Sequence, residues 1–521
     1  MRIIKKSASV VMLAGALLTT SCATDIETGI NNDPQGNAIS FTASVGRSSR
    51  ATEIDVSNLG DFAVAARGMH HDGVLYDNYL IGSASGGEIA KFSSSNNNVS
   101  IWTLGRKVYW PSSLNKVLFI GYTTLKRNES SESGVLDNAS YHLDGDQPTI
   151  SEFSPRKADL KSTPSDGIWA DGEGQKDLLV AFKQQRAQES QTTVDLRFRH
   201  ALTQVSIKAG QNALGANDHR IVKVKGAWIV NAAKSGTLKA TIEKSDPNQT
   251  SGDIVFTNKT EWTTTSTDRE TYGSFYNSII YLKNNGDDDL LRDHSLMLVP
   301  ENLTAWDLTA EDKTGAYIML LCRVELAHEG TRHIPGDGEA KDDTNIDDIA
   351  IVEGSGDAKG MHYHQLFPVN ADKYDGSEYG FVCVPISTDW AADDENDKED
   401  CKGAGKRYTF KLDICGAESD AGYYPPIPSA SSDASPEEVA EAEKAAQAFV
   451  DKLVPPGAMV SALVLNETTK KYKEESVALK VVTKRATGKK VGDPVLDAEI
   501  KFSVSVEEWG TWTNGGSSVK L

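Results

Sequence analysis

The sequence predicts a mainly β protein built from two β-sandwich-like domains, with one amphipathic helix inserted into the second domain. Short runs of alternating or apolar residues recur between clusters of Gly, Asn, Asp and Ser, which is the pattern of strands joined by turns. The length of 521 residues exceeds one ordinary core, so two domains are expected. A single segment, after residue 435, has helical instead of strand periodicity.

The N-terminus has the pattern of a secretory signal. A basic start over residues 1–6 precedes an apolar stretch from Ala8 to Leu18, which is too short to span a bilayer. A small residue directly before Cys22 resembles the lipobox of bacterial lipoproteins, although Leu18 lies one position too far from the cysteine. Residues 1–22 are therefore expected to be a lipoprotein signal peptide with Cys22 as lipidation site. The alternative to lipidation is cleavage of an ordinary secretory signal peptide near this position.

Strand signals dominate from Ile39 onward, after a polar tether. They lie at residues 62–65, 117–120, 178–182, 194–198, 204–207, 221–224, 295–299 and 408–412. A polar break over residues 284–289 predicts a domain boundary near residue 285. The expected division is thus 23–50 for tether and N-terminal strand, 51–285 for the first domain and 286–521 for the second. Inserts are expected near 334–358, 391–402 and 430–490, the first two as acidic loops.

The helix prediction rests on its start and stop signals. Ser435 is a favourable N-cap, Pro436 suits the first helical position and Glu438 follows three residues after the cap. The chain then stops at a Pro-Pro-Gly sequence over 455–457. Helical spacing places Val439, Ala442, Ala446, Phe449, Val450 and Leu453 on one face. Packing on a sheet is the expected role, and a partner contact is the alternative.

Two segments more than four hundred residues apart have nearly the same strand sequence. Residues 39–45 (ISFTASV) and 500–506 (IKFSVSV) both alternate apolar and small polar residues, as in a strand with one buried face. The apolar positions are Ile39, Phe41, Ala43 and Val45 in the first segment and Ile500, Phe502, Val504 and Val506 in the second. The second segment, within residues 499–509, either replaces the first in a neighbouring molecule or pairs within its own chain.

Composition and motifs disfavour several function classes. The net charge of −20 argues against nucleic acid as a partner. The sequence has no GxSxG, HExxH, P-loop or Rossmann motif, so we expect neither an enzyme nor a cofactor. His362 and His364 would share one strand face, but no third ligand is near in sequence, so they are interpreted as surface histidines and no metal is expected.

The cysteines after Cys22 show no metal-binding spacing. Cys322 and Cys383 lie in apolar runs, where a thiol behaves as a small hydrophobic group. Cys401 and Cys415 are left as a possible hairpin disulfide, which the sequence does not settle.

Six short sequence segments occur along the chain in an order that is typical of one protein family. They are VYWP at 108–111, FRHALTQV at 198–205, LMLVP at 296–300, VPISTDW at 384–390, GKRYTFKL at 405–412 and IKFSVSVEEW at 500–509. Together they resemble the fimbrillin family, the lipoprotein precursors of type V pili in Bacteroidales. The acidic insert between Trp390 and Gly405 and the helix-bearing stretch of 430–490 depart from the family pattern.

The resemblance implies an outer-membrane lipoprotein of two β-sandwich-like (transthyretin-like) domains that polymerises outside the cell. In such precursors an arginine-specific extracellular protease removes the N-terminal strand, and the C-terminal strand of another fimbrial subunit replaces it in a homo- or hetero-polymer. Arg50 followed by Ala51 fits the cleavage pattern, and Arg47 is the competing site. The alternative is that both arginines lie in a solvated loop and have no role in processing.

The resemblance favours a stalk subunit of an adhesive fimbria, since both a removable and a donor strand are present; tip and anchor roles stay open. Ligands on host or bacterial surfaces are not readable from the sequence. The alternative function is a monomeric surface lipoprotein that binds glycan or host protein through tryptophans such as Trp262, Trp306 and Trp512.

Overall fold

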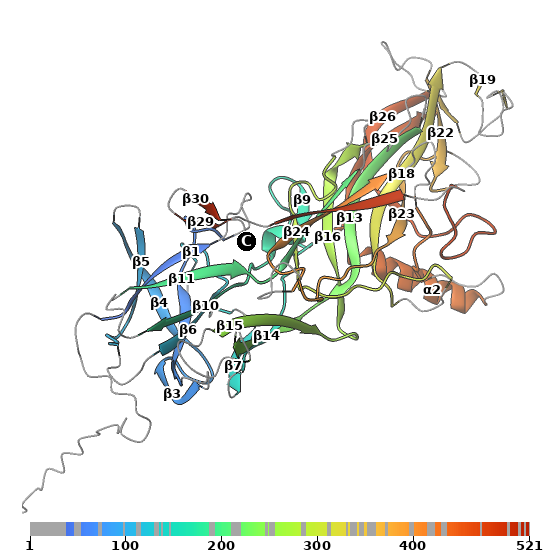
Figure 1. The fold of residues 1–521 in the computed structure, drawn as a ribbon. Helices are drawn as coiled ribbons and strands as arrows, with labels where there is room; N and C mark the ends of the chain where they lie inside the picture. Colours follow the sequence, from blue (N-terminus) through green and yellow to red (C-terminus); the bar gives the residue numbers. More distant parts are fainter. Residues whose placement is uncertain are drawn as a thin grey trace, which may run out of the picture.

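Strands make up most of the molecule, so the mainly β prediction is confirmed. The computed structural model describes residues 38–45, 54–70, 75–96, 99–110, 116–129, 135–136, 139–144, 147–186, 193–209, 220–244, 248, 256–282, 288–309, 314–329, 332–333, 341–342, 349–351, 361–369, 374–394, 401–413, 422–428, 435–468, 471–496, 501–508, 512–514 and 517–519. Figure 1 shows an elongated arrangement with one group of sheets at each end. We call them the first and second lobes.

The first lobe contains a sheet that closes on itself. Its strand order is β3 (Leu75–Ile81), β2 (Phe62–Met69), β4 (Glu88–Asn96), β5 (Val99–Leu104), β1 (Ser40–Val45), β11 (Thr193–His200), β10 (Leu179–Arg186) and β6 (Lys116–Thr123). Strand β2 also pairs with β6, so all of these strands except β3 form a closed ring. Closure leaves a sheet without free edges.

Alternating residues of the ring strands point to two separate cores. One core includes Phe41, Phe62, Phe119 and Phe198, which come from four different strands of the ring and fill its interior. The other core lies against the outer face of β2, β6 and β10. A second sheet covers that face, with the order β15 (Phe256–Thr264), β14 (Gly236–Lys244), β8 (Gln147–Phe153) and β7 (Ser140–Asp144).

The second lobe is a stack of sheets around long central strands. Its larger sheet runs β21 (Ile349–Ile351), β22 (Met361–Phe367), β18 (Tyr317–Glu329), β13 (Arg220–Ala233), β16 (Arg269–Tyr281) and β9 (Ile168–Ala170), with β23 (Glu378–Pro385) on β18 and β27 (Lys480–Val482) on β23. One face packs on a smaller sheet of β17 (Leu296–Leu298), β12 (Thr203–Ala209), β24 (Lys406–Asp413) and β28 (Lys501–Glu508).

The other face of the large sheet is covered by α2 (Pro436–Val450) and the hairpin β25 (Met459–Asn466) and β26 (Lys471–Ala478). The remaining elements are α1 (Asp171–Gly174), β19 (Arg332–His333), β20 (Lys341–Asp342), β29 (Trp512–Asn514) and β30 (Ser517–Val519).

Helix α2 confirms the prediction made from its capping signals. The Ser435 Oγ accepts from the Glu438 N–H at 3.3 Å, and the Glu438 carboxylate accepts from the Ser435 N–H at 2.7 Å. Ala446 and Val450 are buried against the sheet, and Phe449 lies 5.9 Å from the Phe381 ring. The helix therefore packs on the sheet, as expected. The single turn α1 was not predicted.

The division expected near residue 285 does not coincide with a break between sheets. Strands β13 and β16 precede that residue, yet both lie in the same sheet as β18, which follows it. Strand β12 likewise pairs with β24. The second lobe is thus assembled from both halves of the chain. The acidic stretch 334–358, predicted as a loop, contains the short strands β20 and β21 among its described residues.

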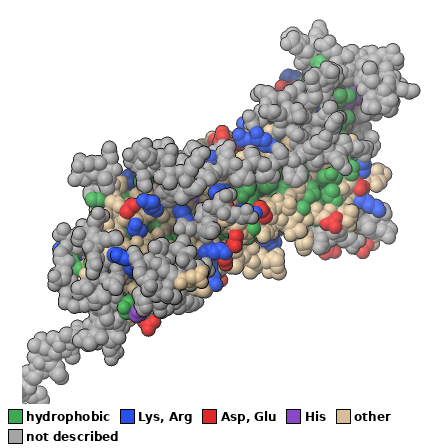
Figure 2. All heavy atoms as spheres, in the orientation of Figure 1, with side chains coloured by type: hydrophobic (Ala, Val, Ile, Leu, Met, Phe, Trp, Pro, Cys, Tyr) green, Lys and Arg blue, Asp and Glu red, His purple; other side chains and the backbone are tan. Residues whose placement is uncertain are grey.

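Charges of both signs share the visible surface. Figure 2 shows Lys and Arg interspersed with Asp and Glu over the described part of that face. Within the described residues, no helix is long and apolar enough to cross a membrane.

Candidate functional site

The position of β1 is the feature that ties the matched strand sequences to the fold. Strand β1 lies between β5 and β11 in the ring (Figure 1). It runs parallel to β11 over six residue pairs, from Ser40–Thr193 to Val45–Phe198, and antiparallel to β5 over two. We call this position the β1 site. Removing β1 would open the ring there and leave the facing backbone groups of β5 and β11 unpaired.

The inner side of β1 fills the core of the ring. Phe41 is fully buried, and its ring meets Phe62 at 6.1 Å and Phe119 at 6.2 Å in edge-to-face geometry. Ile39 and Val45 are also buried, whereas Ala43 is partly exposed. Burial of the three large side chains contributes about 1.5–3 kcal/mol each. The β1 site is therefore an apolar slot with one aromatic position at its centre.

The outer side of β1 is lined by polar groups of β11. The hydroxyls of Ser40 and Thr193 are 3.2 Å apart, and the Thr42 hydroxyl donates to the Asp195 carboxylate at 3.3 Å. The other oxygen of that carboxylate lies 3.5 Å from Arg197 Nε. This side therefore favours small hydroxyl residues in the strand that occupies the site.

Both ends of the segment around β1 are held to the body of the lobe. The Ile39 N–H donates to the Val108 carbonyl at 2.7 Å. Downstream, the Ile54 N–H donates to the Asp177 carboxylate at 3.1 Å, and that carboxylate lies 2.9 Å from Nδ1 of His200 at the end of β11. The side chains of Asp177 and His200 are almost fully buried. Sequence reasoning missed this pair, because no local pattern links residues so far apart.

The C-terminal strand β28 lies elsewhere in the fold. It pairs antiparallel with β24, from Lys501–Asp413 to Glu508–Lys406, at the edge of the four-stranded sheet of the second lobe. Of the two alternatives for this segment, pairing within its own chain thus describes β28 in the single molecule. The β1 site is filled by β1 itself.

The remaining predicted site residues fall outside the described part of the chain. They are the lipidation residue Cys22, the processing residues Arg47, Arg50 and Ala51, and Ile500 of the C-terminal strand. Their predicted roles stay predictions.

The histidines and tryptophans considered in the sequence lie mostly inside the protein. His362 and His364 are each 6% exposed on β22, so the interpretation as surface histidines is wrong. Trp262 and Trp306 are also buried, and the Trp262 indole donates to the Ala201 carbonyl at 2.7 Å. Burial leaves neither of these two indoles available to stack on a ligand at the surface.

The cysteines of the apolar runs are buried in strands, as expected. Cys322 lies in β18 and Cys383 in β23, and burial raises the pKa of the Cys383 thiol well above its usual value. Cys401 is buried, and Cys415 lies outside the described residues, so their pairing stays open.

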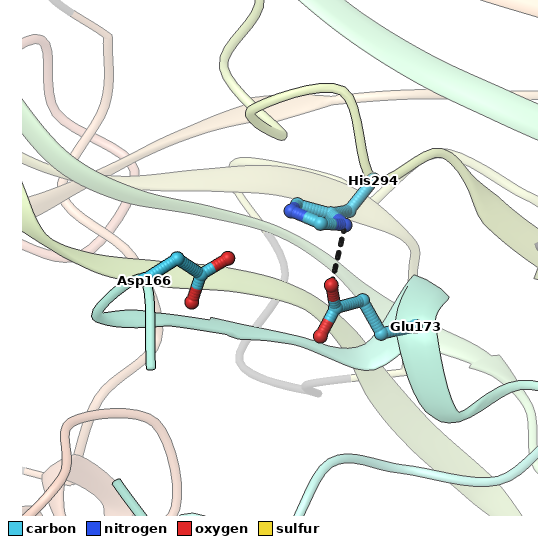
Figure 3. Close-up of side chains that lie close together, drawn as sticks. All are labelled: Asp166, Glu173 and His294. Atoms are coloured by element: carbon cyan, nitrogen blue, oxygen red, sulfur yellow. Dashed lines mark ion pairs between the residues drawn. The ribbon is translucent and has the colours of Figure 1, made fainter. Parts of the chain in front are cut away.

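One group of potential metal ligands occurs among the described residues. Asp166, Glu173 and His294 come from three segments, and their ligand atoms lie within 4.8 Å of one another (Figure 3). His294 Nδ1 is 3.5 Å from the Glu173 carboxylate, and the Asp166 carboxylate accepts from the Ile168 N–H at 3.0 Å. Both carboxylates are exposed. The contacts amount to a surface ion pair beside an acidic turn, and we assign no ion to them.

Comparison with protein families supplies the decisive similarity. Residues 49–282 match the family model described as fimbrillin-like. This part of the chain is similar to the fimbrillin-like family. The match begins beside the predicted cleavage site and spans the ring strands from β2 to β11, together with strands of the second lobe up to β16. The resemblance seen in the sequence is therefore confirmed for this region. No curated protein matches the chain.

Solved structures with a detectable likeness to this chain are distant. A fimbrial protein from Bacteroides vulgatus has 14% identity and a TM-score of 0.33, with 72% of this chain and 94% of the other covered. The fimbrial anchor protein Mfa2 from Porphyromonas gingivalis has 11% identity and a TM-score of 0.18, with 55% and 77% covered. Scores this low do not establish a shared fold, so the similarity to the family rests on residues 49–282.

Proposed function

We propose that this chain is a structural subunit of a type V cell-surface fimbria that polymerises by protease-triggered strand exchange and supports adhesion. Its role is that of a building block and not of an enzyme. The observation that carries the proposal is the place of β1: the strand that closes the ring is the one whose apolar pattern recurs near the C-terminus.

The proposed sequence of events begins at the membrane. The precursor is exported, acylated at Cys22 and held on the outer membrane by the lipid. An arginine-specific extracellular protease then cuts after Arg50, or after Arg47, and β1 leaves with the lipidated segment. The hydrogen bond from Ile54 to Asp177 supports this division, because it holds the retained chain a few residues after the cut.

The vacated β1 site is then filled by the C-terminal strand of another fimbrial subunit. Alignment in the same chain direction places Phe502 where Phe41 was and replaces Ala43 by Val504. Ala43 is partly exposed, so the two added methyl groups would be only partly buried. They would contribute less than about 1.5 kcal/mol, in favour of the incoming strand over the original one. Loss of the cleaved strand makes the exchange irreversible.

Limited trypsin treatment of the purified precursor tests this function. We expect N-terminal sequencing to find a new end at Ala51 or Ser48, and gels run under mild denaturation to show a ladder of polymers. A chain carrying Arg47→Ala and Arg50→Ala is the control and should stay single. A trimmed chain that remains monomeric would instead favour the surface-binding alternative, which ligand-dependent tryptophan fluorescence could then examine.

A further inference from the structure

Strand β11 extends past the end of β1. The six residues of β1 finish at Val45, opposite Phe198, whereas β11 continues through Arg199 and His200. Strand β28 has eight residues and is therefore longer than β1. A strand of that length can pair with β11 beyond Phe198.

The apolar pattern fixes how such a strand would enter. The hole left by Phe41 is lined by Phe62 and Phe119, so it requires an aromatic side chain. In the direction of β1, Phe502 reaches that hole. After a slip of two residues, Ile500 or Val504 would replace Phe502 at the hole and leave a cavity there. For a strand that enters in the direction of β1, as in the proposed function, only one register therefore satisfies the inner face.

That register determines which residues of the two strands stand opposite each other on the outer face. Strand β11 presents Asp195, Arg197 and Arg199 on the side away from the core, since its apolar residues alternate with them. If residue 502 takes the place of residue 41, the partners of β1 place Ser503 opposite Asp195 and Glu507 opposite Arg199. The precursor has Gly46 at the position that Glu507 would take.

We infer that Arg199 is a specificity-determining residue of the β1 site: it pairs with Glu507 of the incoming strand and favours that strand over β1. The inference rests on the proposed function and names the contact that selects the donor. Opposite charges at facing positions stabilise neighbouring strands, and like charges destabilise them. The buried side chains of β1 and of the C-terminal strand are nearly the same and do not distinguish the two strands. Arg199 does, because Glu507 carries a charge and the aligned residue, Gly46, carries none.

In its resting position Glu507 also stands opposite an arginine in the strand register. In the single molecule the register of β28 places Glu507 opposite Arg407 of β24. Transfer to the β1 site of another subunit would therefore exchange one arginine partner for another. The charge at position 507 is matched in both places, which is the complementarity that identifies a second copy of this chain, or a subunit with the same ending, as the occupant.

Charge reversal with rescue tests the inference in the full chain after trimming. We expect Arg199→Glu to lower the rate of polymer formation by roughly three- to tenfold, and Glu507→Arg to lower it as well. The double variant Arg199→Glu with Glu507→Arg should recover most of the wild-type rate. Urea unfolding of the untrimmed Arg199→Glu chain measures any loss of folding stability separately from assembly. If that chain folds poorly, Arg199→Gln replaces it and should lower the rate of assembly by less.

A control separates the two partners of Glu507. Arg407→Glu removes the opposite charge in the resting position only, so it should not slow assembly. The inference is overturned if the Arg199 variants assemble at the wild-type rate or if the double variant recovers nothing. Wild-type chains that never assemble after trimming would instead contradict the proposed function itself.

Discussion

At the scale of single residues, the second lobe contains a buried charge cluster that the sequence does not reveal. Arg323 and Glu325 are fully buried on β18 and paired with each other. The Glu325 carboxylate also lies 2.7 Å from Lys223 Nζ and accepts from the Tyr374 hydroxyl at 2.7 Å. In the sequence these charges look like the solvent side of an ordinary strand. Arg323 donates to the carbonyls of Asp375 and Glu378, about fifty residues along the chain, and no local pattern encodes these contacts.

The cluster makes stability depend on pH. Burial alone would raise the pKa of Glu325, but the charges of Arg323 and Lys223 outweigh it and hold that pKa at about 2. A carboxyl whose pKa is lowered on folding stabilises the folded state above its unfolded pKa, and loses that contribution as pH falls toward the folded value. The contribution of Glu325 is thus present above about pH 4.5 and lost between about 4.5 and 2.

Replacing Glu325 by Gln should therefore destabilise the protein at neutral pH and matter little in acid. We expect a loss of roughly 3–5 kcal/mol at pH 7, because Arg323 and Lys223 keep buried charges without their partner. The difference in unfolding free energy between the variant and the wild type, measured with urea, should become progressively smaller below about pH 4.5. Glu475→Gln, in an exposed pair with Lys473, is the control and should change stability by less than about 1 kcal/mol at any pH. A gap that is constant with pH would contradict the assigned role.

At the scale of helices and strands, the sequence predicted those features that are set by residues close together in the chain. The capping box of α2 and the buried face of β1 were both readable, since each follows from spacings of two to four residues. The parallel partner of β1 is about 150 residues away, at β11, so neither its identity nor its direction could be inferred. The same holds for β28, whose partner in the single molecule is β24.

In the untrimmed chain, mutations on the two faces of β1 should lower the free energy of unfolding by different amounts. Phe41→Ala should cost about 3–5 kcal/mol, because a cavity forms among Phe62 and Phe119. Thr42→Ala on the outer face removes one hydroxyl contact with Asp195 and should cost about 0.5–1.5 kcal/mol. Guanidinium unfolding of the two variants measures the difference. Equal losses would mean that β1 is not seated by its aromatic residue.

At the scale of the whole molecule, topology decides what the protein can do. The mainly β class was predicted from the pattern of short strands, whereas the predicted boundary near residue 285 does not separate the sheets. The closed ring was not predicted, because closure depends on β2 pairing with both β4 and β6. In the proposed function, the ring has no free edge before cleavage and two free edges after β1 is removed. Under that proposal, closure of the ring would keep precursors apart until they are trimmed.

In the proposed assembly, one molecule's C-terminal strand fills the β1 site of a trimmed neighbour. Mixing two disabled chains tests this contact. Chain one carries Phe502→Asp and is trimmed, so it can accept a strand but not donate one. Chain two carries Arg47→Ala and Arg50→Ala, so it can donate but not accept.

Light scattering on the mixture should find a complex of one copy of each chain, and neither longer polymers nor complexes in the separate samples. Two chains that stay single after mixing, or a trimmed Phe502→Asp chain that polymerises alone, would contradict the claim.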